Sequence, residues 1–363
     1  MYKTLKVRLK PTKEQEEQLR INADCARFAY NWTVALFKEW QKGDPYRSSY
    51  DLAKLLRVEY NSGDLRWLKQ GSSQAIKQAV YDAHQALQNF FKGRGFPKFK
   101  SRHRTRPKFF VPVEKVKVDT KRVNLPKLGW VVTSEQLPRK TKFSNPRVSH
   151  DGKYWYLAVG VESEEEAPKA IGNPIGVDLG IKAFATVSDG RKSYQNIAKT
   201  PQAKRLVKRL KRTQRKQARR YRKGESSQNY RKAIAEVRSI YRRIANLRSN
   251  HCHQVTADLV KSKPSVIVIE DLNTSGMMKN RKLARAIAEV TFAEFRRQLE
   301  YKCEANGIEL RLANRFFPSS KSCSRCGRIK EKLSLGERIY RCECGLEIDR
   351  DLNAAINLAK LAS

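Results

Sequence analysis

Four cysteines near the C-terminus are the feature that most constrains the fold. Their spacing is Cys-x2-Cys-x15-Cys-x1-Cys, and they are Cys323, Cys326, Cys342 and Cys344. Two short-spaced pairs about 15 residues apart are typical of a zinc ribbon, in which four thiolates surround one zinc ion as a tetrahedron. Gly327 and Gly345 follow the second cysteine of each pair, where a tight turn often needs a positive φ. The pattern predicts one structural zinc per chain, although the second pair has a one-residue spacer instead of the usual two.

The other cysteines, Cys25, Cys252 and Cys303, lie in helical patterns, where we expect small core residues. Seven cysteines, four of them clustered, favour a reducing compartment with one metal site over a disulfide framework. The N-terminal residues contain no apolar stretch typical of a secretory signal, and no apolar run approaches the ~20 residues of a membrane-spanning helix. We therefore expect a cytoplasmic protein.

The charge of the chain indicates the class of its partner. It carries 76 Lys and Arg against 36 Asp and Glu, a formal charge of +40. Such an excess repels itself unless a polyanion neutralises it, which favours nucleic acid over an anionic membrane or a protein that is merely basic and soluble.

The first half of the chain reads as strands with helices inserted between them. Residues 2–10 alternate as a strand, and helical patterns then run to about Phe91, opening with a possible capping box of Thr12 and Gln15. From 109 to 162 the pattern is β, with strands expected at 113–119, 129–134 and 153–162 and a hairpin turn at Asp151-Gly152. The first strand and the later ones could close one small barrel, and the acidic segment 162–170 is the best domain boundary.

The second half alternates strands and helices, which indicates an α/β domain. Strands are expected at 174–195, 264–272 and 308–317, and one amphipathic helix is expected at 283–307, closed by Gly307. Between the first two strand regions, residues 204–223 contain 12 Lys or Arg and no acid, and apolar positions at 234–244 predict that a helical hairpin forms here.

Three acids at or near strand and helix ends are candidates for a metal site. Asp178 lies on a predicted strand with Gly176 and Gly180 on the same side, and Glu270 ends an apolar strand. Taken alone, either acid could simply mark a turn or a strand end. Together with Asp351, however, they form a set that an α/β sheet could gather, and carboxylates are the ligands that Mg²⁺ or Mn²⁺ prefers. Two such ions drive phosphodiester hydrolysis, so a basic protein with this set is a nuclease candidate.

Asp349 precedes Asp351 by two residues, and the residues alone allow either acid to cap the last helix.

Two basic stretches are candidate nucleic-acid contacts. In the first, basic residues interleave with phenylalanines, of which we expect Phe96 and Phe99 to be core residues. The second is the run at 204–223, which could follow a nucleic-acid backbone or could be a solvated helix face. The candidates are Lys92, Arg94, Lys98, Lys100, Arg102, Lys204, Arg205, Lys208, Arg209, Arg212 and Arg219.

Six segments resemble the TnpB family of transposon-encoded, RNA-guided DNA endonucleases, which are related to the type V CRISPR effectors. They read GVDLGIKAFATVSDG, IVIEDLN, NRFFPSSKSCSRCG, CGLEIDRDLNAAINL, RLKPTKEQEEQLR and GFPKFKSR. The resemblance covers most of the chain and is most specific in the last 100 residues.

The resemblance implies a multidomain α+β fold. It implies a wedge-like β-barrel of residues 1–10 and 95–165, with a helical recognition lobe of residues 11–94 inserted. An α/β RNase H-like (RuvC) nuclease domain, residues 166–363, would follow and contain the zinc ribbon, residues 318–347. The implied catalytic acids are Asp178, Glu270 and Asp351, and the implied cofactors are Mg²⁺ or Mn²⁺ and one structural zinc.

The implied partners are a guide RNA from the transposon end and a double-stranded target DNA with a short adjacent motif. The RNA-guided role agrees with the diffuse positive charge, because base pairing reads the sequence while the protein holds nucleic-acid backbones. The resemblance also implies a nucleoid-associated prokaryotic protein. We expect no membrane partner and favour a monomer.

Other functions remain open. His251 and His253 superficially match the metal site of a tyrosine-using transposase, but they lie in a helical pattern, and aiming both at one metal needs a strand. A guide-dependent DNA-binding regulator without cleavage is a second alternative, against which the three intact acids argue. A transposase accessory protein is a third.

Overall fold

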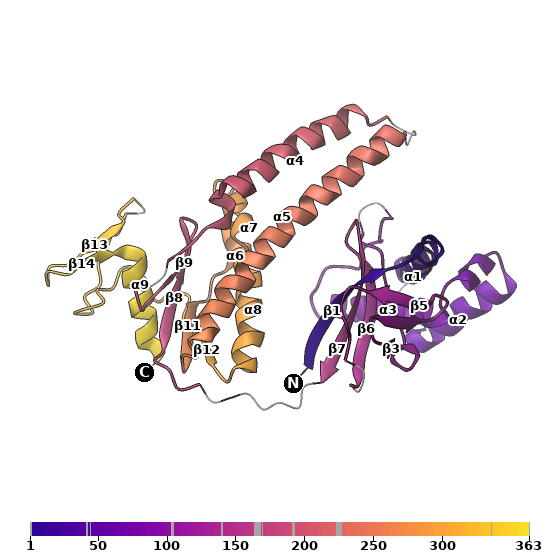
Figure 1. Ribbon diagram of the computed structural model, residues 1–363, viewed down its shortest axis with the longest axis horizontal. Helices are drawn as coiled ribbons and strands as arrows, with labels where there is room; N and C mark the ends of the chain where they lie inside the picture. Colours follow the sequence, from indigo (N-terminus) through magenta and orange to yellow (C-terminus); the bar gives the residue numbers. More distant parts are fainter. Residues whose placement is uncertain are drawn as a thin grey trace. The chain divides into compact units, whose positions relative to one another are not determined.

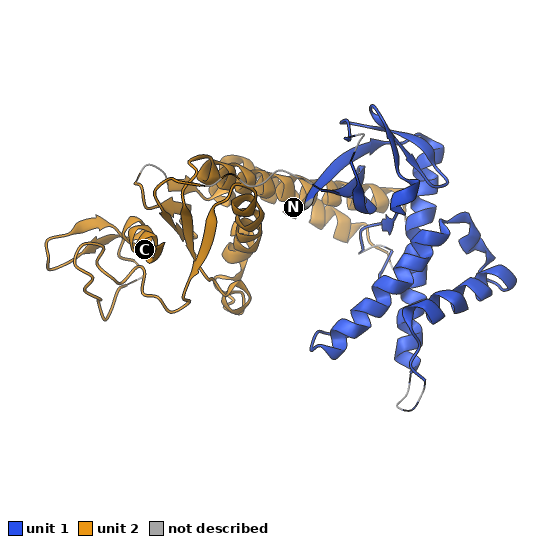
Figure 2. Ribbon diagram, turned by 90° about the horizontal axis from the view of Figure 1, so that it is seen from below, with its two compact units in different colours: residues 1–164 blue, residues 165–363 orange. Residues whose placement is uncertain are grey.

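The computed structural model describes residues 2–40, 43, 45–102, 105–138, 141–162, 168, 170–190, 193–222, 227–334 and 336–362. The chain divides into two compact units, residues 1–164 and 165–363, coloured separately in Figure 2. The division falls inside the acidic segment 162–170, of which residues 163–167 and 169 lie outside the described residues.

Unit 1 is built on a seven-stranded sheet in the order β2-β6-β7-β1-β5-β4-β3. Its strands are β1 (Tyr2–Lys10), β2 (Lys108–Phe110), β3 (Lys117–Asp119), β4 (Arg122–Leu125), β5 (Gly129–Thr133), β6 (Phe143–His150) and β7 (Trp155–Glu162). Strand β1 pairs antiparallel with β7 on one side and with β5 on the other. The first strand therefore joins the later strands, while closure of the sheet into a barrel stays a prediction.

The helices of unit 1 lie between β1 and β2 in the chain. They are α1 (Lys13–Glu39), α2 (Ser49–Ser62), the 3₁₀ helix η1 (Arg66–Gln70) and α3 (Ser73–Phe91). The predicted capping box is confirmed, because Gln15 N donates to Thr12 Oγ1 at 3.2 Å and Thr12 N donates to Gln15 Oε1 at 3.1 Å. Apolar residues of the helices and of the sheet share one core, represented by Leu19, Val80 and Leu157.

Two expectations for unit 1 are wrong. The strand expected at 113–119 is a 3₁₀ helix, η2 (Val113–Lys115), followed by the short strand β3, and Pro112 stands at the N-cap of η2. Phe99 is not a core residue, because it is 49% exposed, whereas Phe96 packs against the core as expected. The hairpin turn is confirmed: Gly152, with φ of 100°, lies between β6 and β7.

Unit 2 contains a five-stranded sheet in the order β10-β9-β8-β11-β12 (Figure 1). Its strands are β8 (Ile175–Leu179), β9 (Ala183–Val187), β10 (Ser193–Gln195), β11 (Val266–Glu270) and β12 (Glu309–Ala313). Strands β8, β11 and β12 are parallel to one another, and β9 is antiparallel to β8.

Helices cover both faces of this sheet. Val177, Ile267 and Ile269 pack with residues of α5 (Gln228–Lys261) and α8 (Phe292–Ala305). On the other face, Val268 packs with Leu358 of α9 (Arg350–Ala359). The predicted α/β arrangement of strands and helices is therefore present.

The predicted helical hairpin is confirmed. Helices α4 (Pro201–Arg219) and α5 run side by side, and Figure 1 shows them extending beyond the sheet. They are joined by an apolar seam that contains Leu210, Val237 and Ile240. A 3₁₀ helix, η3 (Ile197–Lys199), precedes them.

The helix expected at 283–307 is instead two helices, α7 (Ala284–Val290) and α8. They meet at Thr291, which has a left-handed backbone with φ of 60°. Gly307, with φ of 63°, follows the end of α8 as predicted.

The remaining elements are α6 (Thr274–Met277), the hairpin of β13 (Ile339–Arg341) and β14 (Glu347–Asp349), and η4 (Lys360–Ala362). Among the described residues, every helix is too short or too polar to cross a bilayer.

Candidate functional site

The four clustered cysteines form a compact thiol cage. Their Sγ atoms all lie within 4.8 Å of one another, and the pairs Cys323–Cys344 and Cys326–Cys342 are each 3.6 Å apart. Zinc–sulfur bonds of ~2.3 Å in a tetrahedron place sulfurs about 3.8 Å apart, so the cage fits zinc. Gly327 and Gly345 have φ of 77° and 83°, as the tight turns after each pair require.

The electrostatics of the cage also suit a cation. Burial raises the pKa of Cys323, but backbone N–H groups of Cys326 and Arg325 and the neighbouring thiols outweigh burial and lower that pKa to about 6. A backbone N–H of Leu346 lowers the pKa of Cys344, but burial and the other thiols outweigh it and raise that pKa to about 11. One thiol thus ionises readily while another resists, and bound zinc would deprotonate all four.

Asp178 and Glu270 occupy neighbouring positions on adjacent parallel strands. The recorded register pairs Ile267 with Ile175 and Ile269 with Val177, so the next positions along β8 and β11 are Asp178 and Glu270. Because paired residues of parallel strands point to the same face, both acids project from the same side of the sheet at its C-terminal edge.

Helix α9 covers that same face. A Cβ placed on Gly176 would lie 2.1 Å from the carbonyl oxygen of Ala355, so the helix backbone rests directly on β8 there. Asp178, two residues further along β8, shares this face. Asp351 lies one helical turn before Ala355, in the first turn of α9.

The three acids share one electrostatic environment. Burial raises the pKa of Asp178 well above its usual value, and the charges of Glu270 and Asp351 raise it further, while Arg350 opposes them. Within the described part of the chain, only the cysteines bring three or more ligand atoms within 4.8 Å of one another, so the carboxylates are near but not clustered. Mutually repelling carboxylates at one sheet edge are a donor set that fits a divalent cation.

Asp349 and Asp351 have different partners. Asp349 Oδ1 accepts from the backbone N–H of Asp351 at 2.9 Å and of Leu352 at 3.0 Å, so Asp349 is the N-cap of α9. The carboxylate of Asp351 instead lies 3.4 Å from the guanidinium of Arg350. Of the two acids that could cap the last helix, the structure therefore assigns the cap to Asp349.

Sequence reasoning missed two residues beside these acids. Ser319 Oγ donates to Glu270 Oε1 at 2.5 Å, and Arg350 contacts Asp351. A serine in a loop before a cysteine pair carries no signal of its own, so only the fold reveals its contact with Glu270.

The basic candidates at 92–102 differ in exposure. Lys92, Arg94 and Lys98 are exposed, and Arg102 pairs with Asp24 at 3.1 Å. Lys100 is half-buried, with its Nζ 3.0 Å from the centre of the Tyr30 ring.

The candidates on α4 are exposed along the helix: Lys204, Arg205, Lys208, Arg209, Arg212 and Arg219. Of these, Arg209 pairs with Glu236 of α5 at 2.9 Å. Ala203, Leu210 and Thr213 form the buried side of the same helix.

His251 and His253 lie in α5, where residues two apart point in nearly opposite directions. The His251 ring packs on Phe184 with ring centres 5.0 Å apart, whereas His253 is exposed. This geometry does not support the transposase metal site.

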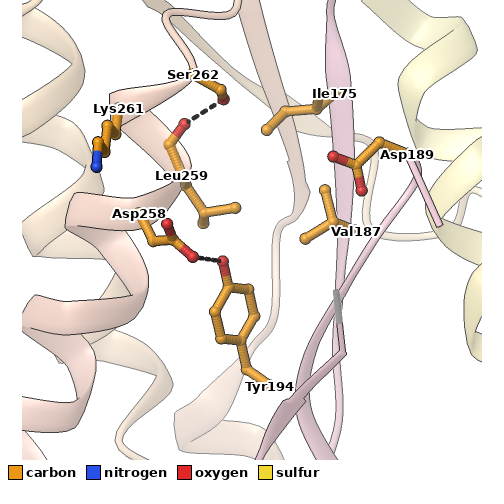
Figure 3. Close-up of a pocket in the computed structure, with 8 residues that line it drawn as sticks. All are labelled: Ile175, Val187, Asp189, Tyr194, Asp258, Leu259, Lys261 and Ser262. Carbon is orange, nitrogen blue, oxygen red and sulfur yellow. Dashed lines mark hydrogen bonds between the residues drawn. The ribbon is translucent and has the colours of Figure 1, made fainter. Parts of the chain in front are cut away.

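A pocket of about 380 Å³ lies elsewhere in unit 2 (Figure 3). It is lined by Ile175 and Val187 of the sheet and by the end of α5, and within it the Tyr194 hydroxyl donates to Asp258 at 2.6 Å. Ile175 begins β8, whereas Asp178 and Glu270 stand at the strand ends and on the opposite face. The pocket is therefore separate from the three acids.

Three family models match the chain. Residues 292–358 match the Cas12f1-like TNB domain, residues 157–281 match the IS605 OrfB family described as "Probable transposase", and residues 1–44 match its helix-turn-helix domain.

Full-length relatives and a solved structure agree with these matches. A Streptomyces pristinaespiralis protein named "Putative RNA-guided DNA endonuclease" is 32% identical over 98% of this chain and 88% of its own. "Putative RNA-guided DNA endonuclease InsQ" of Escherichia coli K12 is 30% identical over 97% of this chain and 90% of its own. The fold resembles the protein of a Cas12f1–sgRNA–target DNA complex, with a TM-score of 0.53, 14% identity, and 99% and 98% of the two chains covered.

Proposed function

Because the chain belongs to the TnpB family, we propose that it is a transposon-encoded, RNA-guided DNA endonuclease that acts in the cytoplasm on DNA of the nucleoid. The observation that carries the proposal is the juxtaposition of Asp178 with Glu270, next to the helix whose first turn contains Asp351. If the three acids lay far apart, the protein could bind nucleic acid but would have no site at which to hydrolyse it.

The proposed catalytic residues are Asp178, Glu270 and Asp351, which would hold Mg²⁺ or Mn²⁺. Bound divalent ions supply an activated water and charge stabilisation for the leaving oxygen. The chain's own contribution is to fix the acids on three different elements: β8, β11 and the first turn of α9. Burial, and then the charges of Glu270 and Asp351, raise the pKa of Asp178, and a bound cation would offset both effects, which supports this role.

The sheet of unit 2 supports a RuvC-like assignment for residues 166–363. When the strands are numbered along the chain of this unit, their order in the sheet is 3-2-1-4-5. The second strand is antiparallel to both of its neighbours, and the first, fourth and fifth strands are parallel to one another. In α/β sheets of this kind, sites form at the carboxyl ends of parallel strands, where Asp178 and Glu270 lie. The zinc ribbon of residues 318–347 would be an insertion in this domain.

The proposed partners are a guide RNA from the transposon end and a double-stranded target DNA, bound by a monomer. Helix α4 supports backbone contact, because its basic side chains are exposed along one helix whose other side is buried against α5. We assign residues 1–10 and 95–165 to a wedge-like barrel and 11–94 to a recognition lobe, which together would read a short motif beside the target.

Two experiments test the proposal. RNA that co-purifies with the protein is sequenced, and we expect one discrete structured species. The complex is then incubated with Mg²⁺ and a plasmid that carries a guide-matched target, and we expect cleavage of the matched plasmid alone. Random cellular RNA fragments would contradict guidance, and specific binding without cleavage would instead indicate a regulator.

A further inference from the structure

One serine, which is not among the proposed catalytic residues, contacts Glu270 directly. Ser319 lies in the loop between β12 and the cysteine cage and is only 4% exposed. Its Oγ donates to Glu270 Oε1 at 2.5 Å. A hydroxyl that donates to a carboxylate at this distance makes a short, charge-assisted hydrogen bond.

The backbone around this serine is itself anchored by α9. Asn357, which is 4% exposed, donates from Nδ2 to Ser319 O at 2.8 Å and to Ser322 O at 2.7 Å. The Ser319 N–H donates to Phe317 O at 2.8 Å. The backbone that carries the Ser319 hydroxyl is thus hydrogen-bonded to the helix whose first turn contains Asp351.

A neighbouring serine shows the ordinary alternative. Ser322 Oγ donates to the carbonyl of Pro318 at 2.9 Å, which satisfies the hydroxyl within its own loop. Ser319 instead reaches a side chain 49 residues away, on a strand end. A hydrogen bond within its own loop would satisfy the Ser319 hydroxyl without the contact to Glu270.

We propose that Ser319 is a positioning residue for Glu270, holding its carboxylate in the orientation that shares a divalent cation with Asp178. The proposal rests on the proposed function of the three acids. A glutamate side chain has several rotatable bonds, and a fixed donor to one oxygen selects one orientation of the group. Loss of such an outer partner of a metal ligand typically weakens metal binding 10–100-fold.

The test measures Mn²⁺ binding by paramagnetic resonance in the full-length chain, freed of nucleic acid and retaining its zinc. Ser319→Ala should weaken Mn²⁺ binding about 10–100-fold. Ser322→Ala, the matched control, should bind as wild type does, and Ser319→Thr, which restores a hydroxyl, should recover most of the affinity. In cleavage assays of the RNA complex, Ser319→Ala should need correspondingly more Mg²⁺ while its rate at saturating Mg²⁺ stays close to wild type.

Glu270→Ala separates the two proposals. If Glu270→Ala loses Mn²⁺ binding while Ser319→Ala binds as wild type does, the positioning role is wrong and the catalytic acids stand. If Glu270→Ala binds Mn²⁺ as wild type does, the proposed metal site itself is wrong. Equal losses in Ser319→Ala and Ser322→Ala, with less zinc retained, would overturn the positioning role in favour of a loop that has lost its structure.

Discussion

Asp349 and Asp351 differ in what their carboxylates contact, although they stand two residues apart. Asp349 caps α9, and an N-cap aspartate replaced by alanine costs about 1 kcal/mol of stability. The carboxylate of Asp351 instead contacts Arg350, and its charge acts on Asp178. We predict that Asp351→Ala lowers Mg²⁺-dependent cleavage at least about 100-fold, because bound metal contributes several kcal/mol to such reactions.

In the same assay, Asp349→Ala should keep substantial cleavage, and Asp349→Asn, which preserves a cap, should match wild type. A gel shift should find RNA and target binding unchanged in all three variants. Near wild-type cleavage by Asp351→Ala would remove that residue from the site, and equal unfolding of both alanine variants would make both acids structural.

The burial of Lys100 leads to a second prediction at the scale of single residues. Burial, and then the charges of Lys108 and Arg147, lower its pKa to about 8, against an opposing effect of Asp82. Between pH ~8 and ~10.5 the unfolded chain binds more protons at this site, so stability rises with pH across that window. Below it, the folded protein bears the full cost of a half-buried ammonium.

We therefore predict that Lys100→Met is more stable than wild type at pH 7, by about 1 kcal/mol or more, and that the gap narrows by pH 10. All five tryptophans lie in unit 1, so denaturant unfolding followed by tryptophan fluorescence reports on the unit that contains Lys100. Lys98→Met, an exposed neighbour, is the control and should change little. A variant less stable than wild type at both pH values would mean that the contact with Tyr30 outweighs burial.

At the scale of elements, the contact of β8 with α9 decides whether the candidate site can form. A Cβ on Gly176 would lie 2.1 Å from Ala355 O and 2.4 Å from Ala359 N, which are backbone atoms that cannot rotate away. Gly176→Ala should destabilise unit 2 by about 3 kcal/mol, at the upper end of overpacking costs. It should also abolish cleavage, because Asp178 and Asp351 stand on the two elements forced apart.

Thermal unfolding followed by circular dichroism measures this effect. Gly336→Ala is the control within the same unit, since the nearest atom to its Cβ would be 3.5 Å away, an ordinary contact. A Gly176→Ala protein that melts and cleaves like wild type would show that α9 can shift without harm.

The elements also show how far sequence reasoning reaches. Residue spacing was enough to predict the cysteine cage, and apolar runs were enough to find β8 and β11. The residues alone do not reveal the break at Thr291, because apolar side chains recur on both sides of this left-handed residue. The contact of Ser319 with Glu270 depends on strand register and loop path, which no local pattern encodes.

At the scale of the whole molecule, zinc should matter to one unit alone. All four cage cysteines lie in unit 2, and all tryptophans lie in unit 1. We predict about one zinc per chain in protein purified without added zinc. Its removal by a chelator should increase proteolysis within residues 318–347 and leave the unfolding midpoint seen by tryptophan fluorescence unchanged. Absence of zinc from such a preparation would contradict the ribbon.

The charge of +40 has its own consequence for binding. Each phosphate contact releases counterions, so about six or more contacts give a log–log slope of affinity against salt of about −5 or steeper. Fluorescence anisotropy with a labelled duplex between 50 and 300 mM salt measures it. A slope near zero would contradict a polyanion partner.

The central position of β1 in its sheet affects how unit 1 folds during translation. Strand β1 is synthesised first, but its partner β7, paired from Tyr2 with Glu162 to Leu9 with Trp155, follows roughly 150 residues later. At ~5–20 residues per second, the nascent strand waits about 8–30 s for β7 while the inserted helices and then β5, the partner of its other edge, emerge. A ribosome that stalls in that interval leaves an unpaired strand available to other chains. Once residue 162 has left the exit tunnel, unit 1 can close while much of unit 2 is still being translated.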